Sequence, residues 1–342
     1  MRERMSGFVK LLQLEIVDAL SSLEEVQTFR WDHWKRESDG GYGTSCVLQG
    51  GLVFEKAGVN ISNVQGHLPP GAIRQMRDRL DCDRFSWWDG KSHLPFFASG
   101  ISLVIHPSNP NAPTVHLNYR YFEIDDPIDE SNQVWWFGGG SDLTPSYLFE
   151  EDCIQFHRSL KDACDRHDRG YYQKFKEWCD RYFYIPHRDE TRGIGGIFFD
   201  DQSGKEASDD DRENLFGFVR DLGKSFVPTY LSILERRRSM NYCDRQKLWQ
   251  QLRRGRYVEF NLIYDRGTKF GLATPGARIE SILMSLPLTA RWEYMTSLSP
   301  LKNSSSSEPQ RDRADSDCLG ERDLEGEEEN LLKVLKRPKD WV

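Results

Sequence analysis

The sequence lacks the signatures that several common classes of protein require. No apolar run approaches the roughly 18 residues of a membrane-spanning helix, and the longest stretches, such as residues 101–105, have the length of a strand. The seven cysteines include no C-x-x-C pair, and a complete P-loop, a Rossmann glycine motif, H-E-x-x-H and G-x-S-x-G are all missing. These absences argue against a membrane protein, a thiolate zinc site, the two common nucleotide-binding loops, a zinc protease and an α/β-hydrolase.

Excess positive charge is also missing, since 46 Lys and Arg residues oppose 54 Asp and Glu residues. A net charge of −8 argues against a nucleic-acid-binding protein that relies on a global basic field. Most of this charge falls in residues 302–330, where ten residues are acidic and four are basic. The remainder contains arginine-rich runs at 236–238 and 253–256, which can hold a small polyanion. With 12% aromatic residues the chain has ample surface to bury, so it is not a disordered protein.

Residues 1–300 contain no linker, which indicates a single domain. Apolar residues recur at helical spacing over 3–24 and predict a helix with one buried stripe. Residues 98–106, 114–123 and 133–138 predict three strands of an antiparallel meander. We therefore expect an α+β domain built around an antiparallel sheet.

The other predicted elements follow the same patterns. Strands are predicted at 45–54, 58–64, 195–200 and 256–265, and helices at 146–166, 171–184, 209–222, 226–239 and 246–254. The acidic segment 303–330 has no hydrophobic period, so it is predicted to be disordered or an insertion. Residues 331–342 are predicted to form a short helix and tail that complete the catalytic domain of 1–300.

Alternation along the meander gathers polar side chains on one face of the predicted sheet. His116, Asn118 and Arg120 project together, because side chains i and i+2 of a strand share a face. Ser102 and His106 share a face of the preceding strand, so pairing of the two strands brings all five into one patch. A solvated sheet face is the alternative interpretation. Three different polar types alternating with aromatic residues are more typical of a functional site.

Two further segments carry open interpretations. Glycines 138–140, followed by Asp142, are predicted as a loop that either lets the backbone approach a ligand or forms a flexible turn capped by Asp142. Asn261 and Asp265 share a face of the predicted strand 256–265, which is either a second polar face or a salt-bridged strand end.

Four histidines are candidate metal ligands, namely His106, His116, His157 and His187. None lies in a motif with ligand spacing, and isolated histidines are more often hydrogen-bonded residues of the core or surface. Metal binding is therefore the secondary hypothesis for them.

Five long motifs stand out as a set. They are H-P-x-N-P-x-A-P-T-V-H-x-N-Y-R-Y-F-E at 106–123, W-W-F-G-G-G-S-D-L-T-P at 135–145, the segment 176–200 around I-P-H-R-D-E-T-R-G-I-G-G-I-F-F-D, R-R-G-R-Y-V-E-F-N-L-x-Y-D-R-G-T-K-F-G-L at 253–272, and G-A-R-I-E-S at 276–281. Together they resemble the oxygen-dependent coproporphyrinogen III oxidase family, and its animal-type members most closely. The resemblance covers about residues 3–297 and 331–342, and the acidic segment has no counterpart that we recognise in the family.

The resemblance implies a fold and a reaction. It implies a homodimer whose subunit is a large antiparallel sheet of about seven strands flanked by helices, with dimer regions that match 59–69 and 257–294. It implies a step of heme biosynthesis in which the A- and B-ring propionates of coproporphyrinogen III become vinyl groups, giving protoporphyrinogen IX, CO2 and H2O2. O2 is then the co-substrate, no organic cofactor is implied, and a divalent metal on the four histidines is left open.

The resemblance also implies roles for residues, motif by motif. It makes His116 the catalytic acid. The implied substrate contacts are Ser102, Asn118, Tyr119, Arg120, Gly276, Ala277 and Arg278. The substrate is a tetraanion, which suits guanidinium groups, so we expect Arg120 and Arg278 to clamp its propionates. Its pyrrole N–H groups need a carboxylate acceptor, for which Asp142 and Asp265 are the candidates. Asp142 is also our hypothesis for the general base.

The expected partners are the substrate and a second copy of the chain, with no nucleic acid and no transmembrane segment. The first residues show no signal peptide, and relatives that enter mitochondria carry a longer leader, so the cytoplasm is predicted. The mitochondrial intermembrane space is the alternative if a leader has been trimmed. Two rival functions are a tetrapyrrole-binding homologue without turnover and a metal-dependent oxygenase acting on another substrate.

Overall fold

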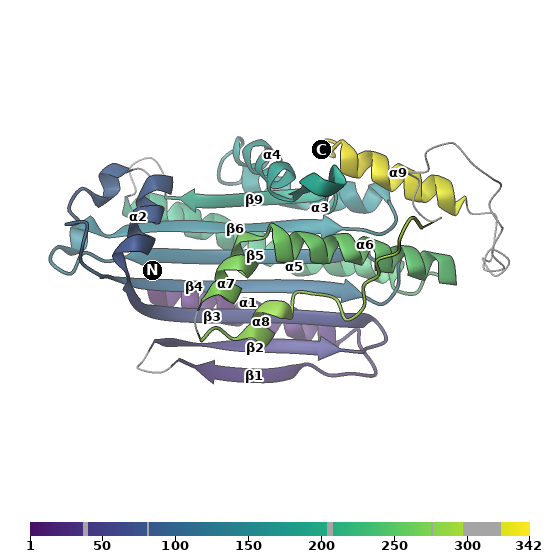
Figure 1. Cartoon of the computed structure of the whole chain (residues 1–342), viewed down its shortest axis with the longest axis horizontal. Helices are drawn as coiled ribbons and strands as arrows, with labels where there is room; N and C mark the ends of the chain where they lie inside the picture. The colour runs from purple at the N-terminus through teal and green to yellow at the C-terminus, as the bar shows by residue number, and fades with distance from the viewer. Residues whose placement is uncertain (37–39, 81, 204–207, 275, 297–322) are drawn as a thin grey trace.

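A seven-stranded antiparallel sheet with the order β1-β2-β3-β4-β5-β6-β9 forms the centre of the molecule (Figure 1). The computed structural model describes residues 1–36, 40–80, 82–203, 208–274, 276–296 and 323–342. The strands are β1 (Arg30–Lys35), β2 (Gly41–Gln49), β3 (Phe54–Leu68), β4 (Leu94–Pro107), β5 (Thr114–Ile124), β6 (Val134–Thr144) and β9 (Gly195–Gln202), with a separate hairpin of β7 (Tyr184–Ile185) and β8 (Glu190–Thr191). The predicted α+β fold is therefore confirmed.

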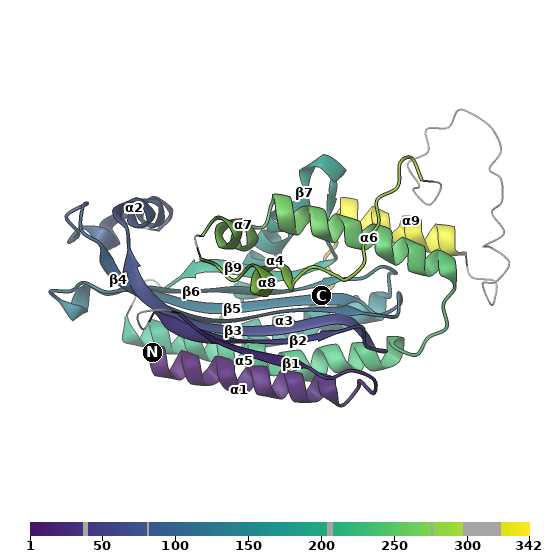
Figure 2. The same ribbon diagram turned by 60° about the horizontal axis from the view of Figure 1, so that its bottom comes forward.

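One face of the sheet, called here the core face, packs against α1 (Arg2–Ser21), α3 (Glu150–Asp165) and α5 (Asp209–Arg237). Figure 2 shows α1 and α5 running beneath the strands. The buried stripe of α1 contains Met5, Val9, Leu12, Ile16 and Leu20, which confirms the helix predicted over 3–24. Because Leu103 and Leu117 point to this face, the even-numbered residues of β4 and β5 point to the other.

The opposite face, called here the site face, is covered by α6 (Asp244–Ile263), α7 (Arg266–Ala273) and α8 (Ile279–Leu283) (Figure 2). The contacts of α8 are specific, since Asn60 Nδ2 donates to the Ser281 carbonyl at 3.0 Å. His106 Nε2 donates to the Ser285 carbonyl at 2.9 Å just beyond the helix. Gly58 leaves room for Met284, because a Cβ at this position would lie 2.1 Å from its sulfur and would force this side chain to move.

The remaining helices are α2 (Pro70–Arg79), α4 (Tyr171–Tyr182) beside β9, and α9 (Leu324–Lys336). Helix α9 begins at Leu324, so the last residues of the predicted disordered segment 303–330 are helical, and that part of the prediction is wrong. Its apolar residues Leu331 and Leu335 are fully buried, which supplies the physical reason. Residues 303–322 lie outside the described residues. Within the part that is described, no helix is long and apolar enough to cross a membrane.

Two secondary-structure predictions that bear on the site are wrong. Residues 256–263 belong to helix α6 rather than to a strand. Buried polar residues, Arg253 and Asn261 among them, complete a helical period that the apolar residues alone do not show. Asp142 lies in strand β6 rather than in a glycine-rich loop, because the small residues of this segment pair with β5 and β9 throughout.

Candidate active site

Strand register gathers the predicted polar residues in adjacent rows on the site face. Asn118 of β5 lies between Ser102 of β4 and Gly140 of β6. In the next row His116 of β5 lies opposite Asp142 of β6. Residues paired across antiparallel strands share a face, so these side chains form the patch that the alternation predicted.

His116 and Asp142 form a hydrogen-bonded pair. His116 Nδ1 donates to Asp142 Oδ1 at 2.7 Å. The aspartate side chain is 2% exposed, whereas the imidazole is 21% exposed. Because the carboxylate holds a proton on Nδ1, the neutral ring keeps Nε2 as an acceptor for a substrate proton. This is the geometry of a general acid or base oriented by a buried carboxylate.

Arg192 binds the other side of the same carboxylate. Its Nη2 donates to Asp142 Oδ2 at 2.7 Å, and its Nη1 donates to Asn261 Oδ1 on α6 at 2.9 Å. The guanidinium is 2% exposed. Three aromatic rings have their centroids 4.2 to 4.9 Å from its Cζ, those of Phe183, Tyr257 and Phe260. The arginine is therefore fixed by charge, hydrogen bonds and cation–π contacts together.

The electrostatics of this group determine which residues can exchange protons. Burial disfavours the charge of Asp142, but Arg192 and His116 outweigh it and lower the pKa of Asp142. Burial also disfavours the charge of Arg192, and Asp142 is the main opposing influence that raises the pKa of this arginine. A carboxylate with a lowered pKa is a weak base, which argues against Asp142 as the general base. His116, whose imidazole is 21% exposed and keeps Nε2 as an acceptor, is better placed to accept a proton.

Arg120 lies flat over Gly138, its partner across the β5–β6 pair. Its Nη1 donates to Asn118 Oδ1 at 2.7 Å, and its Nη2 pairs with Asp200 of β9 at 2.9 Å. A guanidinium has five N–H groups, so two contacts leave donors for a propionate. A Cβ at Gly138 would lie 2.5 Å from Asp200 Oδ1 and 2.8 Å from Arg120 Nη2, so only glycine leaves this space open.

Tyr119 does not reach the site face. It follows Asn118 on β5, so its side chain points to the core face, where it is completely buried. Burial accordingly raises the pKa of its phenol. The Tyr119 side chain therefore faces away from the site, because of the same alternation that brings Asn118 and Arg120 together, and the substrate contact of this residue stays a prediction.

Asp265 has a structural role in this arrangement. Its Oδ2 accepts a hydrogen bond from Thr268 N at 2.6 Å and caps α7, and its Oδ1 accepts one from Tyr182 Oη at 3.0 Å. The aspartate also contributes to the raised pKa of Arg192, after burial, Asp142 and Tyr257. It thus lies on the same side of the sheet as Asp142, with both of its oxygens engaged.

The predicted segment of Gly276, Ala277 and Arg278 lies over the far edge of the sheet. Arg278 forms an ion pair with Asp32 of β1, and its Cζ is 5.7 Å from the ring centroid of Trp34. Gly276 has a φ of +72°, a conformation that favours glycine. At about 4.8 Å per strand, β1 and β5 are roughly 19 Å apart, so Arg278 lies over the β1 edge and Arg120 lies nearer the middle of the site face.

The four histidines do not form one metal site. Each histidine has its own hydrogen-bond partners. His116 binds Asp142, and His106 binds Thr114 and Ser285. His157 binds Tyr172 and Ile194, and His187 binds Tyr264 and Glu259. Among the described residues, no group of three or more His, Cys, Asp or Glu side chains can hold a metal ion. The alternative ligand set of His106, His116, His157 and His187 therefore does not fit a metal.

Sequence reasoning missed two charged residues of this site, Arg192 and Asp200. Both lie in the 176–200 motif, where an arginine and an aspartate occur among glycines and aromatic residues, but no local period indicates their orientation. Their partners, Asp142 on β6 for Arg192 and Arg120 on β5 for Asp200, are distant in the sequence, so only the tertiary structure reveals these contacts.

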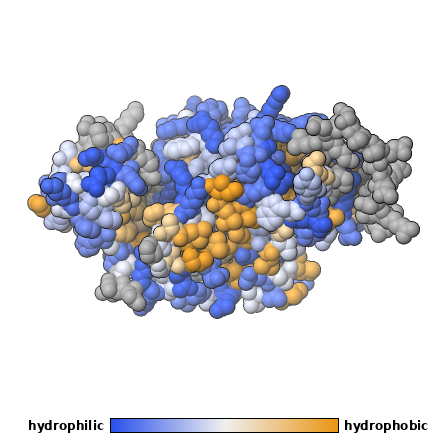
Figure 3. All heavy atoms as spheres, in the orientation of Figure 1, coloured by the Kyte–Doolittle hydropathy of each residue, from blue (hydrophilic) through white to orange (hydrophobic). Residues whose placement is uncertain are grey.

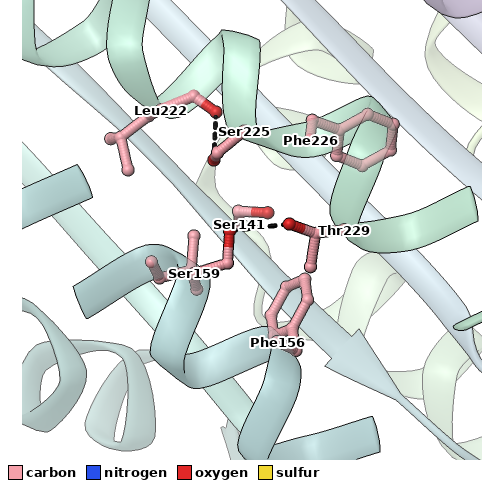
Figure 4. Close-up of a pocket in the computed structure, with 8 residues that line it drawn as sticks. Ser141, Phe156, Ser159, Leu222, Ser225, Phe226 and Thr229 are labelled. Carbon is pink, nitrogen blue, oxygen red and sulfur yellow. Dashed lines mark hydrogen bonds between the residues drawn. The ribbon is translucent and has the colours of Figure 1, made fainter. Parts of the chain in front are cut away.

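A small pocket on the core face is too small for a tetrapyrrole. It lies between Ser141 of β6 and helices α3 and α5 (Figure 4). Its volume of about 10 Å³ is room for roughly one water molecule. Ser159 and Thr229, which line it, hydrogen-bond to each other at 2.6 Å.

Comparison with known proteins agrees with these features. The model of a family described as coproporphyrinogen III oxidase matches residues 4–314. The chain is 50% identical over its whole length to human "Oxygen-dependent coproporphyrinogen-III oxidase, mitochondrial", of which it covers 67%. It is 52% identical over its whole length to the Drosophila melanogaster oxygen-dependent coproporphyrinogen-III oxidase, of which it covers 78%. With the chloroplastic coproporphyrinogen-III oxidase 1 of Arabidopsis thaliana it shares 52% identity, over 86% of this chain and 73% of the relative.

The fold and the site thus define an α+β protein with a buried, charge-paired polar centre on one sheet face. The chain belongs to the coproporphyrinogen III oxidase family.

Proposed function

We propose that the chain oxidises coproporphyrinogen III with O2, converting the A- and B-ring propionates into vinyl groups and giving protoporphyrinogen IX in heme biosynthesis. The relatives are named for this oxygen-dependent activity. The observation that carries the proposal is the hydrogen-bonded series from His116 through Asp142 to Arg192, beside Arg120 on the site face. It combines a proton-transfer group with cations that suit carboxylates.

The balance of the reaction shows what the protein must supply. One propionate, one O2 and one proton give one vinyl group, one CO2 and one H2O2. Removal of a pyrrole N–H proton gives an electron-rich ring that can reduce O2 to a peroxide, which then takes a propionate β-hydrogen as CO2 leaves. No organic cofactor enters this balance, and O2 is the oxidant. The protein must therefore move protons and hold the macrocycle in place.

His116 is the group proposed to move the proton. Its Nε2 is the acceptor in the neutral ring and a donor in the protonated ring, and Asp142 fixes the ring through Nδ1. Asp142 keeps a supporting role in this proposal, because both of its oxygens are bound and its pKa is lowered. The proton released from the pyrrole and the proton taken up with the peroxide can pass through this one imidazole.

Propionate recognition is assigned to the two predicted arginines. Arg120 and Arg278 each have an acidic partner, Asp200 and Asp32 respectively, which holds the guanidinium in place without using all of its donors. Ser102 and Asn118 lie in the row between them and offer neutral hydrogen bonds. We propose that the macrocycle lies across these rows, with propionates toward both arginines.

The proposed assembly is a homodimer. Nine large apolar side chains that are exposed in the described chain lie between 262 and 295: Leu262, Ile263, Phe270, Leu272, Ile279, Leu288, Trp292, Tyr294 and Met295. Figure 3 shows an apolar patch at the centre of the face that carries α7 and α8. Large exposed apolar patches favour protein contacts. Eight of the nine side chains fall within the predicted dimer region 257–294, which supports self-association there.

The compartment stays a prediction. The human and rat relatives are named mitochondrial and the Arabidopsis relative is named chloroplastic. We retain the cytoplasm as the sequence-based prediction and the mitochondrial intermembrane space as its alternative. Fractionation of the cells in which the protein is naturally made, with an antibody against it, decides between the two.

The test of the proposed activity is an assay by fluorescence and chromatography with coproporphyrinogen III as substrate. We expect protoporphyrinogen in air, none under argon, and an unchanged yield in air with a strong chelator. Binding of substrate without product in air would contradict the proposal and favour a tetrapyrrole-binding homologue. Loss of activity with chelator, restored by metal, would contradict metal independence.

A further inference from the structure

The C-terminal tail, by which we mean helix α9 and the residues that follow it, contacts the short segment that carries Arg192. Thr191 Oγ1 lies 3.0 Å from the carbonyl oxygen of Leu335 in α9 and 2.9 Å from that of Gly193, and its single proton is shared between the two acceptors. Trp341 Nε1 donates to the carbonyl of Ile194 at 3.3 Å. Residues 191–194, called here the Arg192 segment, therefore contact the tail at each end, through the shared Thr191 hydroxyl and through the Trp341 indole.

The other side of the Arg192 segment is bound to the active site itself. The amide of Ile194 donates to the carbonyl of Leu143, the residue that follows Asp142 in β6, at 2.9 Å. The amide of Arg192 donates to the carbonyl of Phe183 at 2.8 Å. The segment is thus held between strand β6 and the tail, and Arg192 projects from it to Asp142.

His157 extends the contact with Trp341. Its Nε2 donates to the same Ile194 carbonyl at 3.2 Å, and Tyr172 Oη donates to its Nδ1 at 2.8 Å. The rings of His157 and Trp341 are 6.1 Å apart at their centroids. Trp341 is only 6% exposed, so this side chain near the C-terminus is buried in the protein.

The tail has its own anchors, which fix the position of these donors and acceptors. Leu331 and Leu335 are buried in the main core. Glu328, also buried, accepts a hydrogen bond from Tyr147 at 3.0 Å. Asp340, next to Trp341, pairs with Lys176 of α4 at 3.1 Å. The tail is therefore a fixed support for the Arg192 segment.

We propose that Thr191 and Trp341 are positioning residues of the active site, through which the C-terminal tail holds Arg192 against Asp142. The inference rests on the proposed role of the His116–Asp142 pair. A displacement of about 1 Å in a catalytic group is enough to lower a rate about 100-fold. Because the Arg192 guanidinium must meet Asp142 and Asn261 at once, a loosened segment weakens both contacts.

The test compares variants at the two contacts between the tail and the Arg192 segment. Thr191→Val removes the hydroxyl and both of its contacts at similar volume, Thr191→Ser keeps it, and Trp341→Phe removes the indole N–H together with part of the buried ring. We expect Thr191→Val to lower kcat for coproporphyrinogen III about tenfold per folded molecule, with KM within twofold of the parent. We expect Thr191→Ser to restore most of the rate and Trp341→Phe to lower it severalfold. Lys333→Ala, on the exposed side of α9, is the control and is expected to match the parent.

A pH profile separates positioning from a general loss of stability. Weaker contact with Arg192 lets the pKa of Asp142 rise, so the acidic limb of kcat is expected to move to higher pH in Thr191→Val and to stay in place in Lys333→Ala. The proposal would be overturned if Thr191→Val kept the acidic limb of the kcat profile at the parental pH and a kcat within twofold of the parent. Equal losses in Thr191→Val and Thr191→Ser would also overturn it, because the hydroxyl would then carry no effect.

Arg192→Lys distinguishes failure of this inference from failure of the proposed site. A large loss of kcat in Arg192→Lys with normal kcat in both Thr191→Val and Trp341→Phe would overturn the role of the tail and leave the site standing. Normal kcat in Arg192→Lys would overturn both, because the Asp142 contact would then be dispensable.

Discussion

Asp142 and Arg192 form an ion pair whose side chains are both 2% exposed, with 2.7 Å between the nearest oxygen and nitrogen. Removal of one partner leaves the other charge buried without compensation, which typically costs about 3–5 kcal/mol. This pair is also what fixes His116. The same two residues are therefore expected to contribute both to the free energy of unfolding and to catalysis.

Asp142→Asn tests that link. We expect the free energy of unfolding to fall by about 3 kcal/mol, because Arg192 loses its anion. We expect kcat to fall about 100-fold or more, because His116 loses the acceptor that orients it. Chemical denaturation and steady-state assays measure the two effects.

Asp32→Asn is the matched control for stability, since its pair with Arg278 is more than 40% exposed on both sides. Exposed pairs contribute about 0–1 kcal/mol, so little change in stability is expected. Equal destabilisation of the two variants, or full turnover in Asp142→Asn, would contradict the account.

Gly138→Ala tests the position of Arg120. The added Cβ would lie 2.8 Å from Arg120 Nη2, so the guanidinium must move away from Asp200. We expect KM for coproporphyrinogen III to rise about tenfold with a smaller effect on kcat, because Arg120 binds substrate and does not transfer the proton. Gly7→Ala, where nothing lies within 4 Å, is the control and is expected to keep the parental KM. A KM for Gly138→Ala within twofold of the parent would refute the assignment of Arg120.

Stability is expected to fall as pH decreases below neutrality, and His157 is one cause. Burial lowers the pKa of His157 to about 3, far below the ordinary value of 6.5. Between these values the unfolded chain binds a proton that the native chain does not, so acid favours unfolding. The expected contribution is about 2 kcal/mol lost between pH 8 and pH 5.

Urea denaturation of His157→Asn at pH 8 and pH 5 measures this contribution. The variant is expected to lose less stability between the two pH values than the parent does. His33→Asn, at an exposed position of β1, serves as the comparison and is expected to follow the parent. The prediction fails if the variant and the parent have the same pH dependence.

Phe270→Asp tests the proposed dimer surface. Phe270 is 75% exposed at the apolar patch, and a carboxylate there opposes burial in an interface. Sedimentation is expected to show a dimer for the parent and a monomer for the variant. Leu11→Asp, on α1 across the sheet and 68% exposed, is expected to stay dimeric. A monomeric parent, or dissociation of both variants, would contradict the choice of this surface.

The sequence predicted the part of the site that depends on alternation. Ser102, His116, Asn118 and Arg120 share a face because they lie on two neighbouring strands whose period of two is visible in the residues themselves. The same rule places the Tyr119 side chain in the core, so alternation also predicts which residue of this segment turns away from the site face.

The rest of the site depends on contacts between distant segments. Arg192 meets Asp142 only because the Arg192 segment is bound beside β6, and Asn261 meets Arg192 only because residues 256–263 are helical. In α6 the buried face includes polar residues, so the hydrophobic pattern was consistent with a strand. Tertiary partners, rather than local preference, decide the structure there.

Replacement of His116 tests the central claim most directly. The measurement is the rate of the first vinyl formation in a single turnover of His116→Asn, together with the Kd for coproporphyrinogen III. The account predicts a Kd within about threefold of the parent and a rate at least 100-fold lower, because Asn cannot transfer the proton. A rate within threefold of the parent, at equal substrate occupancy, would contradict the proposal that His116, oriented by Asp142, moves the proton.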